Sequence, residues 1–225
     1  MASTPEVEPP TAASGCVAGL NWRWLGRVPF REALTLQERW IAEHERRGDC
    51  LLLLEHPSTY TTGRGGAEAN LPADPAITVE RIGRGGDVTW HGPGQLVGYP
   101  ILDLRSRGRD VHRYLRALED GIIAFLGEQG VRGTRLDGRT GVWVPQPEGP
   151  ARKIASIGIG VRRSISWHGF ALNLAPDLAA FERIVPCGLD GVEMTSLLRE
   201  NALRVSTEEA APRMAATLAP ILQMI

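Results

Sequence analysis

The sequence predicts a mixed α/β domain of the α+β type, in which mixed sheets are flanked by helices. Two segments have the apolar spacing of amphipathic helices, and several shorter ones alternate or run apolar as strands do. The strands and helices do not alternate regularly, so a doubly wound parallel sheet is not favoured. No internal repeat is visible, and 225 residues suffice for one large domain. We therefore expect a disordered tail over 1–18 and a single domain over 19–225.

The first half of the domain is predicted to hold one helix and four strands. Phe30, Leu34 and Ile41 share one helical face with Arg and Glu between them, and Gly48 follows. We therefore expect a helix over 29–47. Apolar or alternating segments predict strands over 50–55, 60–63, 77–82 and 95–104.

The second half is predicted to begin with a long helix. One apolar stripe runs through 110–129, and Gly130 follows as a cap. Ser206 with Glu209 three residues later predicts a capping box that opens the last helix. Short helical segments are expected at 177–184 and 195–199. Strands are expected at 142–144, 153–161 and 164–174, with a hairpin connection at 145–150.

Charge and hydropathy argue against two classes of partner. The chain has 25 Lys and Arg against 26 Asp and Glu, and a net charge of −1 gives little attraction to nucleic acid or anionic membranes. The longest apolar run is four leucines at 51–54, far short of the roughly 20 residues that span a bilayer. Residues 1–15 lack the basic start and apolar core of a secretory signal. We expect a cytoplasmic protein that binds neither nucleic acid nor membrane.

Lys153 is the only lysine among the 25 basic residues. Arginine stays protonated, whereas lysine can change its pKa and pass a proton. A functional Lys153 is therefore one hypothesis. The other is that an arginine-rich composition left a single lysine behind by drift.

The three cysteines are widely spaced and show no C-x-x-C pattern. Their odd number argues against a disulfide framework, and their spacing argues against zinc. Reduced thiols fit a cytoplasmic protein. Cys187 lies between Pro186 and Gly188, so it is either a nucleophile in a shaped loop or a small buried residue. We expect Cys50 in the core and Cys16 to be inert.

The stretch 84–95 is the densest in glycine and polar residues. Glycines let the backbone approach a ligand closely and direct N–H groups at it. The stretch lacks the Gly-Lys-Ser/Thr of a phosphate-binding loop, and a strand rather than a helix follows it, unlike a dinucleotide site. The alternative is a glycine-rich hairpin. His91 and His168 each precede a glycine and are candidate bases, whereas His56 before Pro57 is expected to be structural.

The segment from Arg84 to Tyr99 resembles the signature of the lipoyl(octanoyl) transferases of lipoate biosynthesis. It reads Arg-Gly-Gly-Asp-Val-Thr-Trp-His-Gly-Pro-Gly-Gln-Leu-Val-Gly-Tyr. Four more segments match this family in the same order, at 60–64, 153–158, 167–173 and 186–188. The resemblance covers residues 20–222.

This resemblance implies the fold of the biotin and lipoate protein ligase catalytic domain. It also implies an acyl-thioester mechanism, in which Cys187 carries the acyl group and Lys153 lowers the pKa of its thiol. No metal site is implied. The substrate-contacting positions that the family motifs imply are Arg84, Gly85, Gly86, Asp87, Val88, Thr89, Trp90, His91, Ser156, Ile157, Gly158, Gly169, Phe170 and Ala171.

The implied reaction moves an octanoyl group from octanoyl-acyl carrier protein to a lysine of a lipoyl domain. It would be the first step of endogenous protein lipoylation. The acceptors would be the lipoyl domains of 2-oxoacid dehydrogenase complexes and the glycine cleavage H protein. No cofactor is expected beyond the phosphopantetheine that carries the acyl group, and the chain is expected to act as a monomer.

Three alternatives remain at this point. The first is an ATP-dependent lipoate or biotin protein ligase on the same fold. The second is a binding module for acyl carrier protein or lipoyl domains without catalytic activity. The third is a thiol hydrolase with a Cys–His pair, which would release free octanoate.

Overall fold

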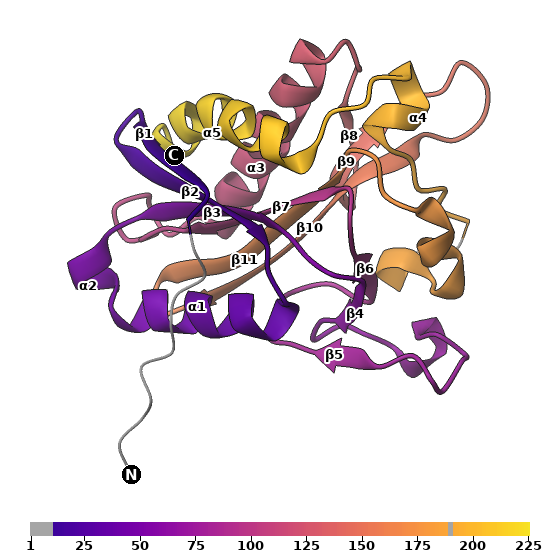
Figure 1. The fold of residues 1–225 in the computed structure, drawn as a ribbon, viewed down its shortest axis with the longest axis horizontal. Coiled ribbons are helices and arrows are strands. Elements are labelled where there is room, and N and C mark those ends of the chain that lie inside the picture. The colour runs from indigo at the N-terminus through magenta and orange to yellow at the C-terminus, as the bar shows by residue number, and fades with distance from the viewer. Residues whose placement is uncertain (1–10, 189–190) are drawn as a thin grey trace.

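The computed structural model describes residues 11–188 and 191–225, apart from the side chain of Cys187. Within them, eight strands form one large sheet in the order β1-β2-β3-β7-β11-β10-β9-β8 (Figure 1). The β2–β3 pair is parallel, and every other pair in this sheet is antiparallel. Its strands are β1 (Ala13–Val17), β2 (Leu20–Arg27), β3 (Cys50–Glu55), β7 (Gln95–Ile101), β8 (Thr134–Leu136), β9 (Arg139–Val144), β10 (Arg152–Arg162) and β11 (Ile165–Asn173).

A small sheet and several helices complete the fold. The small sheet has the order β5-β4-β6 and consists of β4 (Thr59–Thr62), β5 (Val79–Arg81) and β6 (Thr89–His91). The α-helices are α1 (Phe30–Ala42), α2 (His44–Arg47), α3 (Val111–Glu128), α4 (Leu197–Asn201) and α5 (Thr207–Gln223). Short 3-10 helices occupy Glu68–Asn70, Leu178–Arg183 and Pro186–Gly188.

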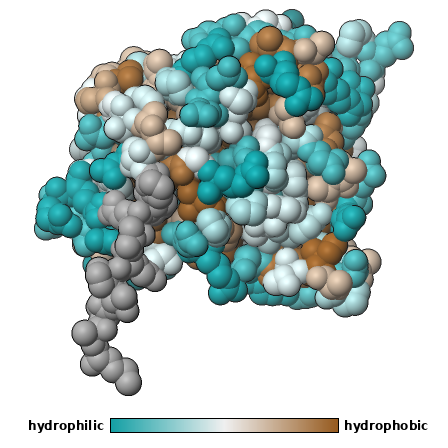
Figure 2. Space-filling model, viewed as in Figure 1, coloured by the Kyte–Doolittle hydropathy of each residue, from teal (hydrophilic) through white to brown (hydrophobic). Residues whose placement is uncertain are grey.

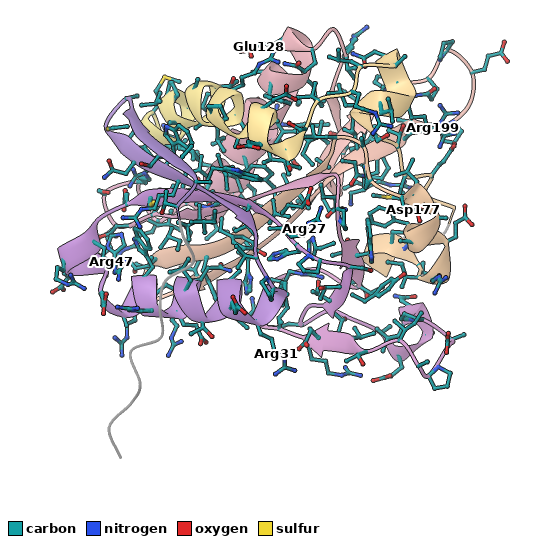
Figure 3. All side chains as sticks on the ribbon, in the orientation of Figure 1. Arg27, Arg31, Arg47, Glu128, Asp177 and Arg199 are labelled. Atoms are coloured by element: carbon teal, nitrogen blue, oxygen red, sulfur yellow. The ribbon has the colours of Figure 1, made fainter. Side chains whose placement is uncertain are left out.

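The large sheet is the middle of three layers. Helices α3 and α5 cover one face, and α1 covers the other (Figure 1). Strand β3 is therefore buried along its whole length, which explains its run of four leucines. This arrangement confirms the predicted mixed α/β class with helices flanking the sheet. Apolar side chains fill the space between the layers, whereas Arg31 and Glu128 lie at the outer surface (Figure 3).

Most of the predicted elements are present with shifted ends. Strand β3 has the predicted bounds, and the capping box of Ser206 and Glu209 opens α5 as expected. The helix predicted over 29–47 is interrupted at Glu43 and forms α1 and α2. Strands β9 and β10 are antiparallel neighbours joined across 145–151, as the expected hairpin requires.

The tail predicted over 1–18 is wrong at its C-terminal end. Residues 13–17 form β1, which pairs with β2, while residues 1–10 lie outside the described part. Strand β1 contains small residues without alternating polarity, so the sequence pattern did not indicate it. It is held by backbone pairing at the sheet edge. Gly15 leaves room for the Trp22 indole, because a Cβ at Gly15 would lie 2.8 Å from Nε1 of Trp22.

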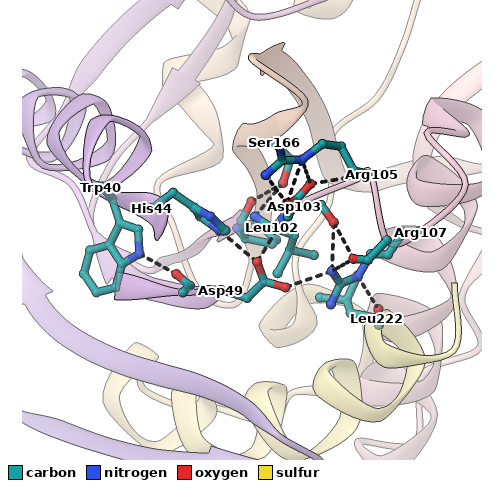
Figure 4. Close-up of polar contacts among 12 residues, drawn as sticks. Trp40, His44, Asp49, Leu102, Asp103, Arg105, Arg107, Ser166 and Leu222 are labelled. Carbon is teal, nitrogen blue, oxygen red and sulfur yellow. Dashed lines mark hydrogen bonds and ion pairs between the residues drawn. The ribbon is translucent and has the colours of Figure 1, made fainter. Parts of the chain in front are cut away.

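A buried arginine ties the end of α5 to the start of β3. The Arg107 guanidinium lies 2.8 Å from Oδ2 of Asp49 and also donates to the carbonyl oxygen of Leu222 at 3.2 Å. The same carboxylate accepts from His44 at 2.9 Å and from the backbone N–H of Asp103 at 2.8 Å (Figure 4). One ion pair therefore joins the C-terminal helix, the α2–β3 turn and the loop after β7.

Polar residues cover most of the molecular face in Figure 2.

We predict that Arg107→Ala lowers the free energy of unfolding by about 2 kcal/mol, because it removes several hydrogen bonds of a buried charged group. Urea unfolding measures this change. Arg105→Ala is the control, since Arg105 makes an exposed ion pair with Asp103 and should matter little. Equal losses in the two variants would contradict this assignment.

Candidate functional site

One cavity of about 340 Å³ gathers most of the predicted substrate-contacting residues. Lys153, the only lysine, also lines it. The wall is built from β6, β7, β10, β11, the starts of α1 and β9, the first turns of α3 and the loop at 82–87. The predicted positions on this wall are Arg84, Gly85, Gly86, Asp87, Thr89, His91, Ser156, Ile157, Gly158, Gly169, Phe170 and Ala171.

Two of the predicted substrate contacts lie elsewhere. Val88 and Trp90 belong to an apolar cluster under the small sheet, and the Trp90 indole donates to Ser58 at 2.9 Å. Successive side chains of an extended chain point to opposite faces. Thr89 and His91 therefore face the cavity, whereas Val88 and Trp90 face the opposite side. The family motif marks the whole segment, but the pleat divides it between the cavity wall and the apolar cluster under the small sheet.

Strand pairing brings two of the motif segments together. In the β10–β11 pair, Ser156 lies opposite Ala171, Ile157 opposite Phe170, and Gly158 opposite Gly169. The segments 156–158 and 169–171 are thus cross-strand neighbours on the cavity wall. Sequence separation hides this relation, and the antiparallel register creates it.

The glycine-rich loop docks onto β10 through its backbone. The N–H of Gly85 donates to the carbonyl oxygen of Ile159 at 2.8 Å. Arg84 is buried and donates from Nη2 to the carbonyl oxygen and to Oγ1 of Thr61, both at 3.0 Å. A Cβ at Gly158 would lie 3.0 Å from Cδ of Arg84, so glycine there permits the close approach. The loop therefore holds a buried cation against the cavity.

The buried histidines in and beside the cavity are neutral. Burial lowers the pKa of His168 to about 3, and the Arg84 charge adds to this effect. Burial also lowers the pKa of His91 well below its usual value, with His56 and Arg84 contributing further. His56 is structural, as predicted, because its Nδ1 contacts the Val28 carbonyl oxygen and its Nε2 contacts the Tyr99 hydroxyl, each at 2.7 Å. None of the three is an imidazolium at neutral pH.

Lys153 is buried near the N-terminal end of β10. It is 2% exposed, and its Nζ lies 5.2 Å from the centroid of the Trp143 ring. Its backbone N–H donates to the Glu193 carbonyl oxygen, and its own carbonyl oxygen accepts from Thr195, both at 2.8 Å. Gly141 leaves room for it, since a Cβ there would lie 2.9 Å from Cε of Lys153. A lysine chain fits this space, and the residue forms part of the cavity wall.

The loop that carries Cys187 lies next to the same wall. A Cβ at Gly188 would lie 2.6 Å from Oδ2 of Asp87, which lines the cavity. The N–H of Val185 donates to the Asn70 carbonyl oxygen at 3.1 Å. Cys187 itself lies in the 3-10 helix Pro186–Gly188, but its side chain is outside the described part. Its expected contact with Lys153 therefore stays a prediction.

The other two cysteines do not line the cavity. Cys50 is buried in β3, as expected, and burial raises the pKa of its thiol to about 12. Cys16 is exposed on β1, at the outer edge of the large sheet. Neither lies where a nucleophile of this cavity would have to be.

The chain matches the family model of the lipoyl protein ligase A/B catalytic domain over residues 29–219. It is 52% identical over 197 residues to an octanoyltransferase of Geobacter sulfurreducens, covering 87% of this chain and 81% of that protein. It is 45% identical over 208 residues to an octanoyltransferase of Mycobacterium tuberculosis, covering 92% and 88%. The chain belongs to the octanoyltransferase family. It is therefore a transferase.

Solved structures similar to this octanoyltransferase-family chain have the ligase fold. A bipartite lipoate protein ligase from Thermoplasma acidophilum aligns with a TM-score of 0.67 at 15% identity, covering 93% of this chain and 85% of that one. A lipoate-protein ligase A bound with ATP gives 0.63 at 14% identity, covering 88% and 83%. A biotin protein ligase from Aquifex aeolicus gives 0.51 at 12% identity, covering 92% and 69%. These likenesses confirm the predicted fold.

Several lining residues of this family member were not predicted. Phe30, Tyr99 and Leu115 extend the apolar wall, and Arg139 and Thr140 lie on it as well. Tyr99 ends the family motif at 84–99, whereas the other segments carry ordinary helix or strand patterns, so no sequence signal separates those residues from core residues. Among the described residues, no helix is long and apolar enough to cross a membrane, and no group of three metal-binding side chains is present.

We predict that stability falls as the pH is lowered from 6.5 to 5. In this range the unfolded chain binds protons at histidines that the folded chain keeps neutral, so lower pH favours unfolding. Urea midpoints at several pH values measure the slope. His56→Gln should reduce it, whereas His112→Gln on the exposed side of α3 should not. A curve without slope in the wild type would contradict the buried neutral histidines.

Proposed function

We propose that this chain transfers an octanoyl group from octanoyl-acyl carrier protein to a lysine of a lipoyl domain, through an S-octanoyl intermediate on Cys187. The observation that carries the proposal is the placement of the only lysine, Lys153, on the wall of a cavity bordered by the Cys187 loop. The identity of the acyl group and the class of reaction are proposed from the octanoyltransferase relatives.

The first step forms the acyl-enzyme. The Cys187 thiolate attacks the thioester carbonyl of the carrier, a new C–S bond forms, and the phosphopantetheine thiolate leaves. The Lys153 ammonium favours the Cys187 thiolate by its charge and gives its proton to the departing thiolate. One thioester replaces another, so the step is close to neutral in free energy.

The second step forms the amide. The neutral amine of the acceptor lysine attacks the acyl carbonyl, and the C–S bond to Cys187 breaks. Lys153, neutral after the first step, takes a proton from the attacking nitrogen, which restores the starting state of the site. An amide is more stable than a thioester, so the reaction needs no ATP.

The cavity suits a saturated acyl chain. Its wall includes Phe30, Ile157 and Phe170, and the nearby histidines are uncharged at neutral pH. Each buried methylene contributes about 0.8 kcal/mol, so a closed apolar pocket can select chain length. The volume of about 340 Å³ lies at the small end of the usual range for ligand sites.

The proposed partners follow from this reaction. They are octanoyl-acyl carrier protein as donor, and lipoyl domains of 2-oxoacid dehydrogenase complexes and the glycine cleavage H protein as acceptors. The donor's phosphopantetheine carries the acyl group, so we propose no cofactor of the enzyme's own and no metal. We also propose a cytoplasmic location and a monomeric state.

The competing function is an ATP-dependent ligase, because a lipoate-protein ligase A bound with ATP shares the fold. An adenylating ligase activates a free acid and does not need an acylated cysteine. Assays with octanoyl-acyl carrier protein, and with octanoate plus ATP, separate the two functions. Transfer only from octanoate with ATP would contradict our proposal.

We predict that Cys187→Ser abolishes the octanoyl adduct, because a serine hydroxyl is not ionised by a neighbouring cation at neutral pH. Intact-mass measurement after incubation with octanoyl-acyl carrier protein detects the adduct. Cys16→Ser is the matched control and should be acylated normally. An adduct that persists in Cys187→Ser would contradict the assignment.

We also predict that Lys153→Arg loses most transfer to the acceptor, although Arg keeps the positive charge. Arg cannot give up a proton at physiological pH, and its planar guanidinium is bulkier than the ammonium group that it replaces. Single-turnover transfer from acylated enzyme to a lipoyl domain measures the effect. Lys153→Ala should in addition slow alkylation of Cys187 at neutral pH. Transfer near the wild-type rate in Lys153→Arg would mean that Lys153 acts by charge alone.

A further inference from the structure

A chain of buried amide side chains connects the cavity to the Lys153 strand. Asn173 and Gln95 are directly paired residues of β11 and β7, and each is 1% exposed. Nε2 of Gln95 donates to Oδ1 of Asn173 at 3.0 Å, and Nδ2 of Asn173 donates to the Thr195 carbonyl oxygen at 2.8 Å. Thr195 in turn donates its N–H to the Lys153 carbonyl oxygen.

The direction of these hydrogen bonds fixes both amides. A carbonyl oxygen can only accept, so the Asn173 group that faces Thr195 is its NH₂ and its Oδ1 faces Gln95. Gln95 must then present its NH₂ to Asn173, and the same NH₂ also donates to the Trp90 carbonyl oxygen at 3.1 Å. The oxygen of Gln95 is left facing Nδ1 of His91 at 3.3 Å.

This orientation decides the tautomer of His91. The Oε1 atom of Gln95 has no proton to give, so Nδ1 of His91 carries the hydrogen. Because the ring is neutral, its Nε2 is then a bare acceptor. The ring lines the cavity and lies parallel to Phe30 at 6.2 Å between ring centroids.

We propose that Gln95 and Asn173 are positioning residues that hold His91 as its Nδ1–H tautomer, so that Nε2 accepts a hydrogen bond from the attacking amine of the acceptor lysine. The proposal rests on the transfer reaction proposed above. His91 orients an N–H of that amine, so that the nitrogen lone pair faces the acyl carbonyl. It does not take the proton, because Lys153 is the base in this step.

The experiment begins with the tautomer itself. Long-range ¹H–¹⁵N NMR of the full-length protein distinguishes Nδ1–H from Nε2–H histidines, and single His→Gln variants assign the signals. We expect His91 as Nδ1–H. His56 is an internal reference in the same spectrum, because its Nδ1 faces the Val28 carbonyl oxygen and does not depend on Gln95. Observation of His91 as Nε2–H in the wild type would overturn the proposal.

The second measurement uses Gln95→Met, which removes the acceptor for His91 together with the Nε2 donor to Asn173 and Trp90, with little change in volume. We expect the Nδ1–H signal of His91 to be lost while that of His56 stays. Single-turnover transfer to the lipoyl domain should become about tenfold slower, the size expected for one lost hydrogen bond, while acylation of Cys187 keeps its rate. Gln129→Met, a buried glutamine at the end of α3 and away from the cavity, should change neither signal nor rate.

Two further outcomes would overturn the proposal. One is a changed His91 tautomer with unchanged transfer, and the other is slower transfer with an unchanged tautomer. Failure of the proposed function looks different, because the wild-type enzyme would then form no octanoyl adduct at all. The tautomer measurement does not depend on that reaction, so the two failures are distinguishable.

Discussion

The antiparallel pairing of β10 with its neighbours is the constraint on which the site depends. On one side, β11 brings Gly169 opposite Gly158 and thereby joins two motif segments into one wall. Beyond the end of β11 on that same edge, the 193–195 segment holds the backbone of Lys153, and β9 pairs along the opposite edge. The loop at 84–86 then docks on the backbone of β10 through the hydrogen bond from the Gly85 N–H to the Ile159 carbonyl oxygen. A register shift of one residue would turn the side chains of β10, including that of Lys153, to the opposite face of the sheet.

Burial gives this wall its electrostatic character. Arg84 and Lys153 are both buried at the cavity, and the histidines beside them are driven to their neutral forms. Positive charge at this wall therefore comes from Arg84, Arg139 and Lys153 and not from imidazolium groups. Such an environment favours a thiolate nucleophile and stabilises a developing oxyanion, while neutral walls accept an apolar chain. The proposed reaction requires both properties.

Sequence patterns were sufficient for elements whose signal is local. The leucine run gave β3 its bounds, and Ser206 with Glu209 marked the start of α5. Strand β1 was missed because pairing at a sheet edge needs no side-chain pattern. The family motifs located most of the cavity wall, but they could not separate Thr89 and His91 from Val88 and Trp90, which the pleat turns away. The tautomer of His91 was also beyond sequence reasoning, because it depends on the cross-strand pairing of Gln95 with Asn173.

In the proposed reaction, Cys187 carries the octanoyl group between two proteins. The most direct test of this role is a pulse–chase experiment on the wild-type enzyme without ATP, followed by peptide mass mapping. We expect an octanoyl group on the peptide that contains Cys187 after incubation with octanoyl-acyl carrier protein. Addition of a lipoyl domain should remove it and produce an equal amount of octanoylated lysine. Octanoylated lipoyl domain that forms with no acylated enzyme at any time, or a label on another residue, would contradict the account.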